Sequence, residues 1–414
     1  MDAARLQRLV DEATARFGSA GGACRAPGRV NLIGDHTDYQ DGLVLPMAID
    51  RDTWCVGTRR SDRLLRLCSL ELDEPVDVSL DDLRPEKVAG WARYPAGVAW
   101  AIEQSGRTLT GMDLLVQSTV PIGAGLSSSA AIELACALTL EFGSGFTVRP
   151  EENARLCRQA ENEFVGVASG IMDQYVGALG EEGQALLIDC RSLRHRTVAL
   201  PTDAQIAVLD SGTSHELKGS GYEDRRAETD RAVTILRDRF PEIRALRDVT
   251  LTMLEQMTDQ LPLLEAKRAR HVVSENVRVL AAADALDCGD LVRLGEVMNE
   301  SHTSLRDDFQ SSLPEIDILA EAARRAGALG ARITGGGFGG AVVALLHGIA
   351  FERFQQEVGD AYTAETGRQA TIFLVHPSPG AGPVVIEDAY DGVRTRIYRL
   401  PDGRYLTDYR FADG

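Results

Sequence analysis

The chain has 414 residues, which is long enough for two domains that each bury a sizeable core. Its formal net charge of -18 argues against nucleic acid or an anionic membrane as a main partner, because both need basic patches. Hydrophobic residues at 44% and charged residues at 26% are ordinary for a soluble globular protein, and seven cysteines without paired spacing favour buried reduced thiols.

The first predicted element is a helix over residues 3–17, where apolar residues recur at helical spacing until Gly18 ends the pattern. The first twenty residues carry acids and lack a continuous apolar run, and no stretch reaches the length of a membrane-spanning helix. We therefore expect a cytoplasmic protein without a signal peptide or membrane anchor.

The segment 26–39 is predicted to form a turn, a short apolar strand and then a loop crowded with polar side chains. Asp35, His36, Thr37 and Asp38 stand next to one another in this loop. Burying such groups is costly unless they are solvated or bind something, so we interpret the loop as a binding site for a polyol. The alternative is a solvated turn.

Three strands and a helix are predicted next, with the strands at residues 43–49, 53–58 and 64–69. Trp91 and Tyr94 open the helix, which runs through Gln104. This aromatic pair either packs into the core or stacks against the base of a nucleotide.

The segment 121–131 joins a buried strand over 114–120 to a helix over 130–142. It carries two glycines with a small residue between them and then three hydroxyls, as Gly123, Ala124, Gly125, Leu126, Ser127, Ser128 and Ser129. A glycine loop that opens a helix aims free backbone N–H groups and the helix dipole at one point, so we predict a phosphate site. The alternative is an ordinary tight turn with serine N-caps.

Helices and strands alternate through the rest of the chain, with a seam near residues 200–206. The run Gly335–Gly340 formally matches the dinucleotide pattern, but the apolar residues 341–346 that follow predict a strand where that fingerprint needs a helix. A nicotinamide-dependent oxidoreductase is therefore a disfavoured alternative. The tail beyond a Pro/Gly linker at 377–383 is predicted to form a β-hairpin around Pro401-Asp402-Gly403.

No Walker lysine, nucleophile elbow or paired-histidine zinc motif is present in the sequence. The charge of a bound triphosphate would then need Mg²⁺, held by a serine hydroxyl of the loop and a carboxylate from elsewhere. Phosphoryl transfer also needs a group that accepts the proton of the attacking hydroxyl. Asp173 is the candidate base, with Arg29 as the candidate for stabilising charge beside it.

Three separated segments, 28–39, 121–131 and 334–340, resemble the three motifs of the GHMP small-molecule kinases, and the first resembles the galactokinase signature. The similarity covers roughly residues 20 to 376 in the right order. It implies an α+β, two-domain GHMP kinase fold with the active site in the cleft between the domains. The expected domains are residues 1–205 and 206–380, followed by a C-terminal extension over 381–414.

The resemblance also implies a role for each matched residue. Asp173 and Arg29 would be catalytic, and Asp35, His36, Asp38, Gly170 and Tyr222 would bind the sugar. Gly123 to Ser129 would wrap the ATP phosphates, with Ser129 and Glu161 as Mg²⁺ ligands, and Trp91 and Tyr94 would form the adenine pocket. For each residue the alternative is a structural role, such as a core aromatic for Tyr222.

The resulting prediction is an ATP- and Mg²⁺-dependent sugar 1-kinase that makes α-D-galactose 1-phosphate, acting as a monomer or homodimer. The chain has Asp35 where the family usually has Glu, and Gly336 where it often has Ala. These departures put the identity of the sugar in doubt. The alternatives are a related kinase for L-arabinose or N-acetylgalactosamine, and a sugar-sensing regulator that keeps the fold without catalysis.

Overall fold

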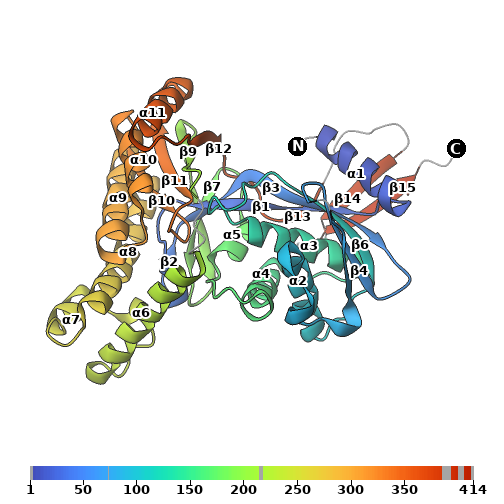
Figure 1. Cartoon of the computed structure of the whole chain (residues 1–414), viewed down its shortest axis with the longest axis horizontal. Helices are drawn as coiled ribbons and strands as arrows, with labels where there is room; N and C mark the ends of the chain where they lie inside the picture. The colour runs from blue at the N-terminus through green and yellow to red at the C-terminus, as the bar shows by residue number, and fades with distance from the viewer. Residues whose placement is uncertain (1–2, 73, 214–217, 385–392, 400–404, 412–414) are drawn as a thin grey trace.

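The computed structural model describes residues 3–72, 74–213, 218–384, 393–399 and 405–411. It is an elongated molecule in which the N-terminal half lies at one end and a group of long helices, α8 to α11, lies at the other (Figure 1). Among the described residues, no helix combines the length and hydrophobicity that crossing a membrane requires.

The N-terminal half is built on a mixed six-stranded sheet with the order β13-β1-β3-β6-β4-β5. The strands are β1 Ala23–Asn31, β3 Pro46–Arg59, β4 Leu64–Ser69, β5 Val76–Ser79, β6 Met112–Ser118 and β13 Gly382–Pro383. The two strands expected at 43–49 and 53–58 are instead the short β2 Leu43–Val44 and the long β3. β3 pairs with β1 on both sides of a register irregularity, so the strand continues through the polar residues Asp50, Arg51 and Asp52, which interrupt the apolar pattern.

The two faces of this sheet bury different side chains, because successive residues of a strand point in opposite directions. On β3, Cys55 enters the core beneath the helices α2 to α5, whereas Trp54 and Val56 pack against α1. The helices are α1 Ala3–Phe17, α2 Arg93–Gln104, α3 Ser128–Ser144, α4 Pro150–Gln159 with the π-helix Ala160–Val165, and α5 Met172–Leu179.

A small sheet, β2-β7-β8, connects the two halves through α8 Leu263–Asp287, which contacts both of its outer strands. Its later strands are β7 Gln184–Asp189 and β8 Arg194–Ala199. The loop that carries Asp35 to Asp38 precedes β2, so this sheet fixes the loop between the two halves of the molecule.

The C-terminal half contains a four-stranded sheet of order β10-β11-β9-β12, with β9 Ala204–Asp210, β10 Gly330–Thr334, β11 Ala341–His347 and β12 Thr371–Val375. The glycine run joins β10 to its antiparallel neighbour β11, which confirms the predicted strand–turn–strand. No helix follows Gly340 in this described stretch, so the dinucleotide fingerprint is incomplete.

Both faces of the second sheet are buried, which explains the unbroken apolar sequence of β11. Val342 and Ala344 pack against C-terminal helices, while Val343 and Leu345 enter a core shared with Val30 and Leu32 of the N-terminal half. The helices are α6 Lys218–Arg239, α7 Leu251–Gln256, α8, α9 Leu291–Ser304 with the π-helix Leu305–Phe309, α10 Pro314–Arg325 and α11 Phe351–Thr366.

The chain returns to the N-terminal sheet after β12. Pro377 bridges to Ile49, Gly380 N donates to Gly180 O at 2.7 Å, and β13 pairs with β1. The open edge of β1 offers unpaired backbone groups, and the Pro/Gly segment satisfies them.

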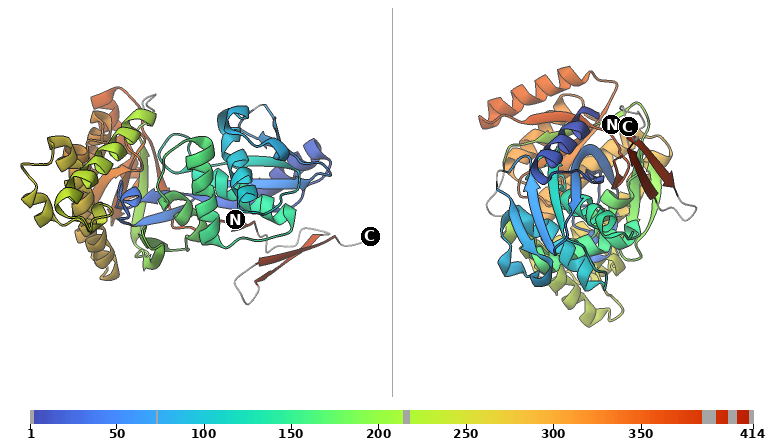
Figure 2. Two further views of the ribbon diagram at one scale, coloured as in Figure 1. Left: turned by 90° about the horizontal axis from the view of Figure 1, so that it is seen from below. Right: turned by 90° about the vertical axis from the view of Figure 1, so that its right-hand side faces the viewer.

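Beyond that segment, β14 Val393–Arg399 and β15 Tyr405–Phe411 pair antiparallel. They lie on the side of the N-terminal half in both views of Figure 2. The turn expected at Pro401-Asp402-Gly403 falls outside the described residues. All seven cysteines are free thiols; six are buried, and Cys288 is exposed.

Candidate active site

A cavity between the two halves gathers every residue that was predicted for catalysis or sugar binding. It has a volume of about 180 Å³. Its lining includes Arg29, Asp35, His36, Asp38, Gly170, Asp173 and Tyr222, together with Glu161, Val167, Ser169, Met172, Gly335 and Gly336. These residues come from β1 and the loop after it, the π-helix after α4, the segment that leads into α5 with the first turn of α5, α6, and the glycine turn after β10. The fold therefore assembles groups that sequence spacing could not place together.

Arg29 near the end of β1 and Asp173 in the first turn of α5 form a bidentate ion pair in this cavity. Arg29 Nε donates to Asp173 Oδ1 at 2.8 Å and Nη2 donates to Oδ2 at 2.7 Å. The Arg29 side chain is 5% exposed, whereas 27% of the Asp173 side chain remains exposed. A carboxylate oriented in this way can accept a proton from a nearby hydroxyl, with a fixed positive charge beside it.

The predicted phosphate loop between β6 and α3 lies directly beside this pair. Gly125 O accepts a hydrogen bond from Arg29 Nη1 at 2.6 Å. Gly123 and Gly125 have φ values of +82° and +77°, which glycine adopts without strain. Ala124 and Leu126 are buried and anchor the loop in the shared core, so its backbone is left to face the site.

Ser127 occupies the N-cap position of α3 but does not cap the helix, so the serine N-cap alternative is wrong for this residue. Its φ of +60° lies in the left-handed region that disfavours side chains, and its hydroxyl makes no capping bond. The Ser127 Oγ instead donates to Asp173 Oδ2 at 2.5 Å. The first N–H groups of α3 are thus left uncapped by Ser127, as an anion site requires.

Asp38 and Gly170 press against each other in the wall of the cavity. A Cβ built on Gly170 would lie 1.7 Å from Asp38 Oδ2, so only glycine leaves room for this carboxylate. The close approach places the carboxylate and the Gly170 backbone together, where both can hydrogen-bond hydroxyls of one ligand.

The variant Gly170→Ala should raise the KM for the sugar by roughly 10- to 100-fold, since a displacement of about 1 Å in a binding group can cost this much. Steady-state kinetics with the sugar varied at saturating ATP would measure the effect. Gly359→Ala is the matched control, because a Cβ there meets no atom within 4 Å and should leave the KM unchanged. An unchanged KM in Gly170→Ala would contradict the placement of Asp38.

Burial, assisted by the negative charge of Asp173, raises the pKa of Asp38 to about 6. Below that pH the carboxyl gains a proton and loses its charge-assisted acceptor strength. We expect kcat/KM for the sugar to fall as the pH drops through about 6. A pH–rate profile would measure this fall as an acid limb. Asp38→Asn should be less active, and its profile should lack that limb. A limb that persists in Asp38→Asn would assign the titration to another group.

An aromatic wall closes the side of the cavity opposite α5. The His36 ring stacks on Phe309 at 4.3 Å between centroids and lies 5.6 Å from Tyr222. Burial holds the pKa of His36 well below its usual value and the pKa of Tyr222 well above its own. Both rings are therefore neutral near pH 7, and each can hydrogen-bond hydroxyl groups without carrying charge.

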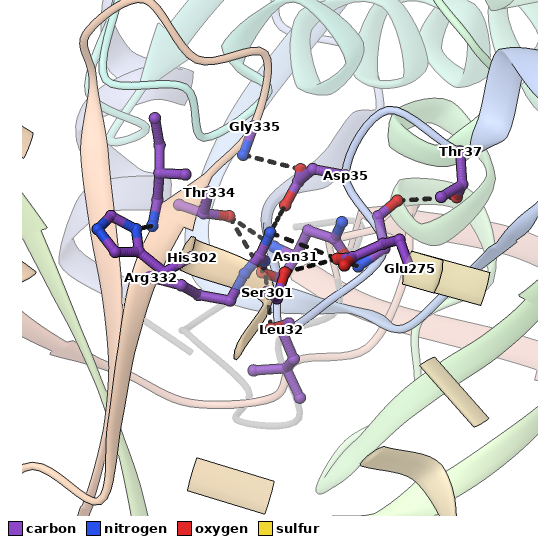
Figure 3. A network of polar contacts seen from close by, with 12 residues as sticks. Asn31, Leu32, Asp35, Thr37, Glu275, Ser301, His302, Arg332, Thr334 and Gly335 are labelled. Carbon is purple, nitrogen blue, oxygen red and sulfur yellow. Dashed lines mark hydrogen bonds and ion pairs between the residues drawn. The ribbon is translucent and has the colours of Figure 1, made fainter. Parts of the chain in front are cut away.

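Asp35 lines the same cavity, but both of its carboxylate oxygens are already engaged. Oδ1 accepts a hydrogen bond from Gly335 N at 3.0 Å, and Oδ2 pairs with Arg332 Nη2 at 2.5 Å (Figure 3). Burial raises the pKa of Asp35, while the charge of Arg332 opposes the rise. Asp35, which is one methylene shorter than the glutamate usual in the family, is thus bound to the glycine turn that starts at Gly335.

Glu161 lies at the junction of the cavity with the first turn of α3. Its Oε2 accepts hydrogen bonds from Ser169 Oγ at 2.5 Å and Gln174 Nε2 at 2.8 Å, and burial raises its pKa despite these donors. Ser129 also hydrogen-bonds to it. No arginine or lysine in the described part of the chain forms an ion pair with Glu161. Within the described ranges, Glu161 is therefore an acidic group without a basic partner.

The oxygen donors of Ser129 and Glu161 suit Mg²⁺, which prefers one or two protein ligands plus phosphates and water. The described residues contain no cluster of three or more His, Cys, Asp or Glu that would hold a metal alone. The fit therefore depends on a bound polyphosphate to complete the coordination.

A second cavity, of about 220 Å³, lies on the other side of the phosphate loop. Trp91 and Tyr94 line it together with Ser128 and Ser129, so the structure brings the predicted base-stacking aromatics to the predicted phosphate loop. Both rings are partly exposed rather than sealed in the core. This arrangement favours the nucleotide interpretation of the aromatic pair over simple core packing.

Sequence reasoning missed several residues that support the site. Phe309, Gln174 and Arg332 each contact a predicted site residue through stacking, a hydrogen bond or an ion pair. Arg332 did carry a signal, because it is a lone charge in the otherwise apolar strand β10. Phe309 carried none, since an aromatic residue among charged neighbours is common in surface helices.

Three family profiles match the chain in order. The galactokinase galactose-binding signature matches residues 14–59, the GHMP kinases N terminal domain matches 93–181, and the GHMP kinases C terminal domain matches 280–364. The chain is 48% identical over 363 residues to a galactokinase of Roseiflexus sp. (strain RS-1), covering 87% of this chain and 92% of that protein. It is 47% identical to a galactokinase of Chloroflexus aggregans, covering 86% and 92%.

Solved structures give the same family relationship. The crystal structure of Lactococcus lactis galactokinase complexed with galactose is 33% identical and superposes with a TM-score of 0.88, covering 92% of this chain and 100% of that one. A mevalonate kinase with 17% identity and a TM-score of 0.59, covering 86% and 99%, shares the fold. These similarities confirm the predicted α+β GHMP kinase fold.

Proposed function

Because the chain belongs to the galactokinase family of GHMP kinases, we propose that it transfers the γ-phosphate of ATP to the anomeric hydroxyl of D-galactose. The product is α-D-galactose 1-phosphate. One observation carries this proposal: the Arg29–Asp173 pair lies in a cavity lined by hydroxyl-binding groups and touches the predicted phosphate loop through Gly125.

Asp173 accepts the proton of the anomeric hydroxyl as that oxygen attacks the γ-phosphorus, and ADP leaves from the opposite side. Arg29 orients the Asp173 carboxylate and adds positive charge beside the transferring phosphoryl group. Both contacts of Arg29 support this assignment, since its guanidinium joins Asp173 to the carbonyl of Gly125. No covalent enzyme intermediate is needed.

The sugar is held by Asp35, His36, Asp38, Tyr222 and the backbone at Gly170. Their common cavity and the neutral state of His36 and Tyr222 support this assignment, because a hexose presents hydroxyls rather than charges. Asp38 supplies the charge-assisted acceptor above its pKa of about 6.

ATP occupies the second cavity with its base beside Trp91 and Tyr94 and its phosphates along residues 123–129. Ser129 and Glu161 would hold Mg²⁺, and the buried carboxylate of Glu161, which forms no ion pair with a described residue, supports that role. The ion, when bound, neutralises charge on the β- and γ-phosphates. We also propose a cytoplasmic location, which the six buried free thiols support. We further propose that the protein is a monomer or homodimer.

A coupled assay for ADP across a panel of monosaccharides tests the proposal. We expect D-galactose to be turned over best and ³¹P NMR to show the α-1-phosphate. Better turnover of L-arabinose or N-acetylgalactosamine would reassign the substrate. ADP formation with none of the sugars, together with binding of galactose, would indicate a sensor.

A further inference from the structure

A chain of four charges, of which Asp35, Arg332 and Glu275 are buried and Arg278 is partly exposed, runs from the sugar cavity into the C-terminal half. Arg332 Nη2 lies 2.5 Å from Asp35 Oδ2 and 3.9 Å from Glu275 Oε1, and Glu275 Oε2 accepts from Arg278 Nε at 2.7 Å. The side chains of Arg332 and Glu275 are 0% exposed and that of Asp35 is 2% exposed. The charges alternate in sign from Asp35 to Arg278.

These contacts tie together segments that are far apart in the sequence (Figure 3). Arg332 Nη1 donates to Asn31 O at 3.0 Å and to Leu32 O at 3.2 Å, which attaches β10 to the end of β1. Glu275 Oε1 accepts hydrogen bonds from Gly34 N at 3.0 Å and Ser301 Oγ at 2.6 Å. Both halves of the molecule therefore meet at Arg332.

Such a network is a poor way to gain stability. The loss of hydration when two ions are buried can cancel the attraction between them, so a buried ion pair often adds no more to the free energy of unfolding than well-packed apolar side chains would. On its own face of the sheet, Arg332 lies opposite Val343 of β11, which is apolar and buried, so an apolar residue would suit position 332 as well. The position of Arg332 is better explained by the residues that it keeps in place.

These residues form one wall of the sugar cavity. Asp35 and Gly335 both line that cavity, and they are joined by the hydrogen bond from Gly335 N to Asp35 Oδ1. A Cβ on Gly335 would lie 2.7 Å from Gly125 O, so the same turn also packs against the phosphate loop.

We infer that Arg332 is a positioning residue that sets the sugar-binding wall formed by Asp35 and the turn at Gly335–Gly336. This inference rests on the proposed kinase function of the same cavity. Arg332 contacts neither substrate; it acts by fixing the direction of the Asp35 carboxylate and the distance between the two halves at that wall.

The test compares Arg332→Lys and Arg332→Met with the unaltered enzyme. Lysine keeps the charge, but its single nitrogen cannot reproduce the separate positions of Nη1, which contacts the two carbonyls, and Nη2, which contacts Asp35. We expect the KM for galactose to rise at least about 10-fold in both variants, with the KM for ATP and the kcat at saturating sugar changed less than about 3-fold. Arg332→Met should show the larger rise.

Arg60→Met is the matched control, since Arg60 pairs with the buried Asp113 at 2.7 Å and lines neither cavity. It should lower the Tm without changing the KM for galactose. If Arg332→Met unfolds, the double variant Asp35→Asn/Arg332→Met removes the unpaired buried charge. It should recover the Tm and leave the KM for galactose high.

Folded Arg332→Lys and double variants with an unchanged KM for galactose would overturn the inference. Equal losses in the KM for galactose, the KM for ATP and kcat would also overturn it, because they would indicate a general structural role. An unaltered enzyme that does not phosphorylate galactose would instead overturn the proposed function, so the two failures are distinguishable.

Discussion

The variant Asp173→Asn is expected to lose roughly 10²- to 10⁴-fold in kcat, which is the usual contribution of a positioned general base. Asparagine has the same shape as aspartate, but it cannot accept the proton of the attacking hydroxyl. It also removes the charge that Arg29 contacts at 2.7 and 2.8 Å. Single-turnover measurement of phosphoryl transfer would isolate the chemical step.

Binding of ATP should remain nearly intact in Asp173→Asn, because Asp173 lines the sugar cavity and not the cavity beside Trp91 and Tyr94. Nucleotide affinity by calorimetry is therefore the internal control. Asp248→Asn offers a second one, since Asp248 forms a comparable ion pair with Arg191 at 2.6 Å outside both cavities. Turnover in Asp173→Asn comparable with that of the unaltered enzyme would remove Asp173 from the base role.

The variant Arg29→Met is expected to lose about 10²- to 10³-fold in kcat, the range observed when one preorganised charge or donor is removed from a transition-state site. Two effects add here. The transferring phosphoryl group loses a positive charge, and Asp173 loses the fork that fixes its orientation. The kcat of Arg29→Lys should lie between those of Arg29→Met and the unaltered enzyme, because lysine restores the charge without the bidentate geometry.

Arg25→Met separates this effect from a loss of stability. Arg25 lies on the same strand and pairs with Asp52 at 2.9 Å with its side chain 11% exposed, but it lines neither cavity. We expect a lowered Tm and a kcat within about twofold of the unaltered enzyme. Equal losses of kcat in Arg25→Met and Arg29→Met would show that Arg29 acts only through stability.

The elements that the sequence predicted best are those whose signal is local. The helix over 3–17 appears as α1 with the same bounds, because its apolar stripe and the closing Gly18 are both contained in one short window. The strand–glycine turn–strand at 331–346 was predictable for the same reason. The single long β3 was not, since it pairs with β1 on both sides of the three polar residues 50–52 that break the apolar pattern.

The sequence by itself determined the candidates for the chemistry: a predicted phosphate loop, a candidate acid for proton transfer and a candidate arginine to stabilise charge, each readable from residue type and motif. Tertiary structure alone decided which of these groups meet. Arg29 reaches Asp173 across 144 positions, and Arg332 reaches Asp35 across 297, because β1, α5 and β10 converge at the boundary between the two halves. The charge of Arg332 was visible in the sequence. Its partner, Asp35, depends on how the two halves pack, and no local sequence pattern encodes that packing.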